Sequence, residues 1–137
     1  MLQFKEYIEE DLKKTQSKMP EPPKRDENGK VKVMSGKEAM QHFPRASMNA
    51  VMRHPLYKKH IATSGHQGFA HSVEKVLPDD PTYDRHIVHA VTGGEHIRHR
   101  IDFHLGLSHR KVDHVEHFVN RNNEKDSKGR VVWKHAA

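Results

Sequence analysis

The chain has 137 residues, of which 34% are hydrophobic, so we expect one domain of ordinary size with a small core. It contains no cysteine, which excludes disulfides, thiolate zinc sites, iron–sulfur clusters and cysteine nucleophiles. No apolar run approaches the ~18 residues of a membrane span, and the start lacks a secretory signal pattern. We therefore expect a protein that is neither secreted nor in a membrane. The net charge of +6, with histidines neutral, favours an anionic partner such as nucleic acid.

The N-terminal part of the chain divides into two segments. Residues 1–14 place Phe4, Ile8 and Leu12 at i, i+4 and i+8, which predicts an amphipathic segment. Residues 15–34 contain three closely spaced prolines and little apolar content, which is typical of a flexible linker. Together they predict a disordered N-terminal arm.

Residues 35–121 are predicted to form a His-rich helical domain. Ser35 and Glu38 have the spacing of a capping box, and the helix they open should end before Pro44. A second helix should end at Pro55, which then opens a further turn. Apolar residues three or four apart predict more helices at 69–77, 82–91, 95–105 and 109–121. The predicted fold class is therefore mainly α, a small bundle of five or six short helices.

One weak internal repeat suggests a small amount of β-structure. The segments 26–33 and 126–133 share the pattern Asp-x-x-Gly-basic-Val, and each is typical of a turn that leads into a short strand. We expect 30–34 to pair with 130–134, within a C-terminal tail that spans 122–137.

The most distinctive motif is a histidine pair that occurs three times, as HIVHAV at 86–91, HIRHRI at 96–101 and HVEHFV at 114–119. In a helix, positions i and i+3 share a face, so the histidines would border a buried apolar stripe. If the pairs converge, they would bind zinc or another divalent transition metal, with a neighbouring carboxylate from Glu95, Asp102, Asp113 or Glu116. The alternative is that these histidines are amphipathic residues at helix edges. The candidate ligands are His86, His89, His96, His99, His109, Asp113, His114 and His117.

Familiar catalytic motifs are absent from the sequence. The glutamate of EHIRH precedes the first histidine, so the zincin motif His-Glu-x-x-His is missing. No nucleophile elbow is present, and a Ser–His–Asp triad cannot be recognised from sequence. We therefore name no catalytic residue and favour a protein that is not an enzyme.

Clustered basic residues are candidates for nucleic-acid binding. They would contact phosphates without reading bases, and the alternative is that they form solvated surfaces. The candidates are Arg98, Arg100, Arg110, Lys111, Lys58 and Lys59.

The opening residues MLQFKEYIEE resemble the capsid-targeting leaders of internal head proteins from large contractile-tailed bacteriophages. Those leaders are short amphipathic segments that end in Leu/Ile-x-Glu, where the prohead protease cuts. Ile8 and Glu10 match this signal, and the resemblance covers ten of the 137 residues. It implies targeting through Phe4, Tyr7 and Ile8 and a cut after Glu10.

The resemblance implies a non-enzymatic, virion-associated phage protein found in the virion or the host cytoplasm. Its partners would be capsid or other virion proteins, with DNA as a further partner. One alternative is a metal-dependent hydrolase or nuclease that uses His96, His99, His114 and His117 as ligands. Another is a head decoration or head–tail module, whose assembly should depend on pH between about 5 and 7.

Overall fold

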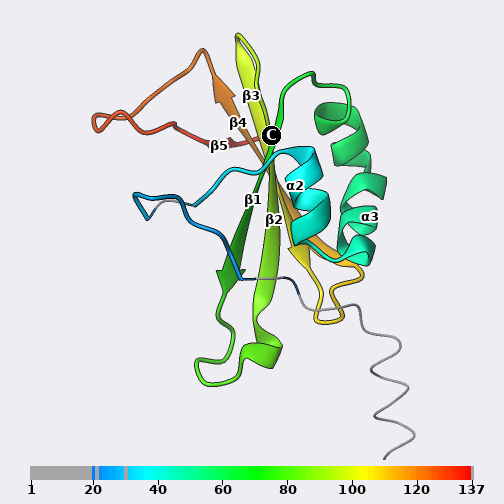
Figure 1. Cartoon of the computed structure of the whole chain (residues 1–137). Helices are drawn as coiled ribbons and strands as arrows, with labels where there is room; N and C mark the ends of the chain where they lie inside the picture. The colour runs from blue at the N-terminus through cyan, green and yellow to red at the C-terminus, as the bar shows by residue number, and fades with distance from the viewer. Residues whose placement is uncertain (1–19, 21, 30, 137) are drawn as a thin grey trace, which may run out of the picture.

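The computed structural model describes residues 20, 22–29 and 31–136. Two short helices come first, α2 (Gly36–His42) and α3 (Arg45–Arg53), followed by the π-helical turn η1 (Tyr57–Ile61). The strands β1 (Gln67–Glu74), β2 (Arg85–Thr92), β3 (Ile97–Leu105), β4 (Val112–Arg121) and β5 (Lys134–His135) follow, with the 3₁₀ turn η2 (Pro81–Tyr83) before β2. The strands form one antiparallel sheet in the order β1-β2-β3-β4-β5. Figure 1 shows the two helices side by side against the sheet.

The two helices predicted at the start of the 35–121 domain are confirmed by the structure as α2 and α3. The Ser35 hydroxyl accepts a hydrogen bond from the Glu38 backbone N–H and caps α2, as the capping box requires. Helix α2 ends before Pro44, and α3 ends before Pro55. Within the described residues, no helix is long and apolar enough to cross a membrane.

The prediction of a mainly α fold is wrong, because the segments at 69–77, 82–91, 95–105 and 109–121 are largely strands. The error arises from the spacing of Ile97, Ile101 and Leu105. A repeat of four is close to the helical period of 3.6 but is also a multiple of the two-residue period of a strand. Phe103 distinguishes a strand from a helix. It is fully buried on the same side as Ile101, two residues away, as in a strand, whereas on a helix the two side chains would point to different faces. The frequent β-branched residues also favour strands.

Among the described residues, the predicted pairing of 30–34 with 130–134 is not formed. Each repeat instead closes on itself, through a bridge between Arg25 and Val31 and another between Lys125 and Val131. Gly29 and Gly129 have φ angles of 76° and 77°, a conformation that favours glycine, so the repeats do mark turns.

Met34, which follows the first repeat, pairs with Phe69 instead. Its backbone N–H donates to the Phe69 carbonyl at 2.6 Å, and the Phe69 N–H donates to the Met34 carbonyl at 2.8 Å. Met34 is also a buried member of the core. The chain just before α2 therefore lies along the outer edge of β1.

The hydrophobic core lies between the helices and one face of the sheet. Phe69, Val88, Ile101 and Phe103 contribute from the strands, and every one of them is at most 1% exposed. The buried residues contributed by the helical segment are Ala39, Phe43, Met48, Val51, Tyr57 and Ile61. We call this side of the sheet the helix face. The opposite side, which carries Arg100, Asp102 and His104, is called the outer face.

Replacing Phe103 with alanine should reduce the free energy of unfolding by about 3–5 kcal/mol, because it leaves a cavity at the centre of the core. Urea denaturation measures the change. Leu107→Ala is the control, because Leu107 is 52% exposed and its loss should change stability by less than about 0.5 kcal/mol. Equal effects of the two substitutions would contradict this description of the core.

Candidate metal centre

The three histidine pairs lie on strands or beside them, so their spacing has a different consequence from the one predicted. Successive side chains of a strand point to opposite faces, and two residues three apart therefore lie on opposite faces. His86 lies on the helix face, whereas His89 pairs with Asp102 on the outer face. His117 and His114 are separated in the same way. The prediction that the members of a pair share a face is therefore wrong.

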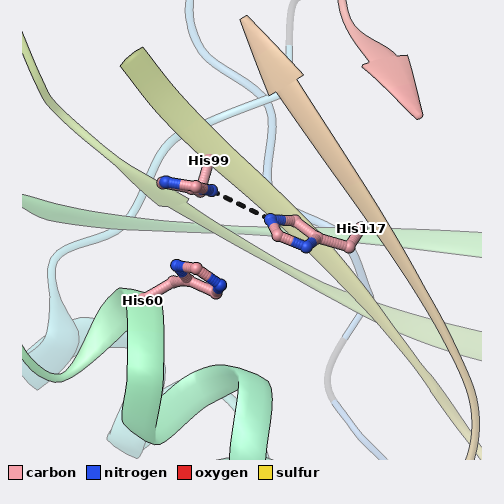
Figure 2. Close-up of side chains that lie close together, drawn as sticks. All are labelled: His60, His99 and His117. Carbon is pink, nitrogen blue, oxygen red and sulfur yellow. Dashed lines mark hydrogen bonds between the residues drawn. The ribbon is translucent and has the colours of Figure 1, made fainter. Parts of the chain in front are cut away.

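Three histidines converge on the helix face, next to the core. His99 comes from β3, His117 from the neighbouring β4, and His60 from the turn η1 (Figure 2). The Nδ1 atom of His99 lies 2.9 Å from the Nε2 atom of His117. The ring of His60 stacks on that of His99, with centroids 4.2 Å apart, and lies 4.8 Å from that of His117. One ring nitrogen from each residue lies within 4.8 Å of the others.

The position of His60 follows from the packing of η1. Tyr57 and Ile61, at the two ends of this turn, are buried in the core. They hold the turn against β2 and β3, so that the half-buried His60 points toward the sheet (Figure 2). The three elements thus place three imidazoles at the border between the core and solvent.

The electrostatic surroundings keep these imidazoles neutral. Burial lowers the pKa of His99 to about 4, with further lowering by His60, His117 and Arg121. Burial also lowers the pKa of His60 and of His117, and the nearby Lys59 acts in the same direction on both. Neutral imidazoles have the free lone pair that a metal requires. The positive charges of Lys59 and Arg121, in contrast, repel a bare metal ion and favour an anion beside it.

Three imidazoles are a donor set that zinc accepts, and the His60 ring, which stacks on that of His99, would have to rotate to direct its lone pair at the same ion. Zinc–imidazole bonds are about 2.0–2.1 Å long, so two ligands of one tetrahedral zinc ion lie about 3.3 Å apart. The His99 and His117 nitrogens, 2.9 Å apart, form a hydrogen bond in this structure, and a metal ion would replace that bond and separate them slightly. Three histidines also leave one position of a tetrahedral ion for water or substrate.

Two other predicted ligands, His86 and His109, belong to a buried row of histidines on the helix face. His42 Nε2 lies 2.9 Å from His71 Nδ1, and His71 Nε2 lies 2.9 Å from His86 Nδ1. The ring of His109 packs edge-on against His86, with centroids 5.3 Å apart. Burial lowers the pKa of His71 to about 3, assisted by the neighbouring histidines His86, His42 and His89. The geometry is that of a hydrogen-bonded row of neutral imidazoles.

His89 lies on the outer face and takes part in a different network. Its Nε2 atom is 2.6 Å from the Ser72 hydroxyl, and its Nδ1 atom is 2.6 Å from an Asp102 carboxylate oxygen. Arg100 donates two further hydrogen bonds to Asp102, of 3.0 and 2.8 Å. Burial acts to raise the pKa of Asp102, but the hydrogen bonds from His89 and Arg100 outweigh it and hold the pKa at about 2.

The hydrogen bonds from Ser72 to His89 and from His89 to Asp102 connect the side chains in the same order as in a Ser–His–Asp catalytic triad, which could not be recognised in the sequence. A serine nucleophile also needs free N–H donors that stabilise an oxyanion. Ser72 lies on the edge strand β1, whereas His89 and Asp102 lie on strands inside the sheet. The three side chains form a row of hydrogen bonds that links β1, β2 and β3 on the outer face.

The remaining predicted ligands are dispersed. His96 is exposed in the turn before β3, and Asp113 is exposed in β4 with its carboxylate against Gly106. His114 lies on the outer face beside His104 and Glu116. Thus the structure brings His99 and His117 together, adds His60, and separates them from the other predicted ligands.

His60 and His104 were not among the candidate ligands because neither belongs to a repeated pair. No local pattern identifies them, since their partners are supplied by other elements. A strand assignment for 97–105 would have placed His104 on the opposite face from His99, because they are five residues apart.

The basic residues proposed for nucleic-acid binding lie in three places. Arg98 donates to the side chains of Asn120 and Asn123, and Arg100 is engaged by Asp102 and lies over the Phe118 ring at 4.8 Å. The others are Lys58 and Lys59 on η1, and Arg110 and Lys111 just before β4. The predicted targeting residues Phe4, Tyr7, Ile8 and Glu10 lie outside the described residues. Nucleic-acid contact and capsid targeting stay predictions.

The buried row predicts acid-sensitive stability. His71 has a pKa near 3 in the fold but an ordinary value of 6.5 when unfolded, so the unfolded chain binds more protons between these values. Its contribution to stability is therefore complete above about pH 7 and is lost as pH falls toward 3. His71→Gln should weaken the dependence of the unfolding free energy on pH, measured by urea denaturation from about pH 7 to pH 4. His96→Gln, an exposed control, should preserve it. An unchanged pH dependence in His71→Gln would contradict this assignment.

No protein-family model, curated protein or solved structure matches the chain.

Proposed function

We propose that this protein binds a divalent transition metal of the zinc type through His60, His99 and His117. The observation that supports the proposal is the approach of one ring nitrogen from each residue to within 4.8 Å of the other two. The ligands come from three separate elements, which the fold brings to one place (Figure 2). Their proximity in the folded chain reduces the entropy cost of collecting them around an ion.

We further propose that the metal serves a hydrolytic reaction on an anionic ester, such as a phosphodiester. A bound divalent ion acts as a Lewis acid toward an ester oxygen when one of its positions stays open. All three histidines are half-buried rather than enclosed, so the site borders solvent. Lys59 and Arg121 would attract and orient an anionic substrate there. This supports the metal-dependent hydrolase among the functions considered from the sequence.

Other interpretations make different predictions about these residues. If the three rings are only a packing cluster at the helix–sheet border, chelators will not affect the protein. A virion-associated role remains a separate proposal, because it rests on the resemblance of residues 1–10, and such a role is compatible with metal binding.

Removing one ligand should remove one bound metal ion. We expect His99→Ala to lose one equivalent of zinc relative to the wild-type chain, measured by mass spectrometry on untagged protein purified without a metal column. A chelator should lower the melting temperature of the wild-type protein, because a ligand present at 100 times its Kd stabilises the fold by about 2.7 kcal/mol. His96→Ala is the matched control, since His96 lies outside the cluster and is exposed. Equal zinc content in the wild-type protein and His99→Ala would refute the proposed centre.

The hydrolytic role is tested with a chromogenic phosphodiester. Hydrolysis should stop after chelation, return when zinc is added, and fall at least about tenfold in His117→Ala. Arg121→Gln should raise KM more than it lowers kcat. The substitution removes a charge that attracts the substrate, but it leaves all three metal ligands in place. Metal binding without chelator-sensitive hydrolysis would leave the centre in place and reject its proposed reaction.

A further inference from the structure

A second group of metal-binding side chains lies on the outer face of the same two strands. His104 of β3 is directly opposite His114 of β4, and Glu116 lies two residues further along β4 on the same face. A carboxylate oxygen of Glu116 is 3.3 Å from His104 Nε2 and 3.7 Å from His114 Nε2. The three ligand atoms all lie within 4.8 Å of one another.

The environment of His104 is the second observation that points to a ligand. His104 is only 8% exposed, and its Nε2 atom is buried without a hydrogen-bond partner among the described residues. The Glu116 oxygen is near this nitrogen, but it is not aligned for a hydrogen bond. A buried polar atom without a partner costs free energy, so native proteins rarely keep one without a reason. A metal ion between His104 and Glu116 would satisfy this nitrogen.

The charges on the outer face also favour a cation at this position. Glu116 and Asp102 are cross-strand partners on this face, and both carboxylates act electrostatically on His104, opposed by the guanidinium of Arg85. Arg100 is already engaged by Asp102 through two hydrogen bonds. His114 has a side chain that is 60% exposed and leaves the group accessible from solvent. The group therefore combines one buried nitrogen, one exposed nitrogen and one carboxylate.

We propose that His104, His114 and Glu116 form a second metal site, of the two-histidine, one-carboxylate class, for zinc or another divalent transition ion. Such a ligand set leaves positions open for water or for an oxygen ligand from a substrate. The two sites lie back to back on β3 and β4. His99 and His104 are an odd number of residues apart, as are His117 and His114, so the strands supply ligands to both faces.

This inference does not depend on the centre at His60, His99 and His117, because the two sites share no ligand. Zinc titration of the metal-free full chain by calorimetry, with bound zinc counted by mass spectrometry, tests both sites together. The wild-type chain should bind two equivalents. Glu116→Gln should lose one of them or bind it at least about tenfold more weakly, because it removes a ligand charge and preserves the side-chain shape. Circular dichroism checks that the variants are folded.

Three variants separate the two sites. His114→Ala removes an exposed ligand with little risk to folding and should repeat the effect of Glu116→Gln, whereas His96→Ala should keep both equivalents. His99→Ala should lose the other equivalent and keep the outer one. A single equivalent that is lost in His99→Ala but unchanged in Glu116→Gln and His114→Ala would overturn the second site. A single equivalent with the reverse pattern would support the second site and overturn the function proposed above.

Discussion

The alternation of side chains along β2, β3 and β4 is the constraint on which the rest of this protein depends. It directs Val88, Ile101 and Phe103 toward the helices, where they form the core. It directs Arg100 and Asp102 to the outer face. A shift of pairing by one residue would exchange the two faces and expose the core, so the apolar row also determines the register. The positions of the chemically active side chains follow from that register.

The same alternation explains why a protein with 14 histidines does not have one large cluster. Each His-x-x-His unit within a strand contributes one imidazole to each face, as His114 and His117 do in β4. On the helix face, the histidines surround the core and are partly desolvated, so burial lowers the pKa of several of them. On the outer face, histidines lie beside carboxylates, as His89 lies beside Asp102. Two environments therefore arise from one repeated sequence, one with neighbouring cations and one with neighbouring carboxylates.

Local interactions were the part of the fold that could be predicted. The Ser35 cap, the helix boundary before Pro44 and the turns at Gly29 and Gly129 each depend on residues close in sequence. The strands were missed because a four-residue spacing satisfies both helical and extended periods, and because histidine obscures the polar–apolar alternation. In β3, Phe103 was the residue that could have resolved the ambiguity, since it continues the two-residue repeat that includes Ile101.

The sequence by itself determined the supply of ligands, the positive charge, the absence of cysteine and the local caps and turns. It also identified His99 and His117 as candidate ligands. Only the tertiary structure decided which histidines meet. His60 reaches His99 and His117 because the buried ends of η1 hold that turn against the sheet, and His104 reaches His114 through strand register. Contacts between elements far apart in sequence depend on packing and register, and no pattern within a single segment contains that information.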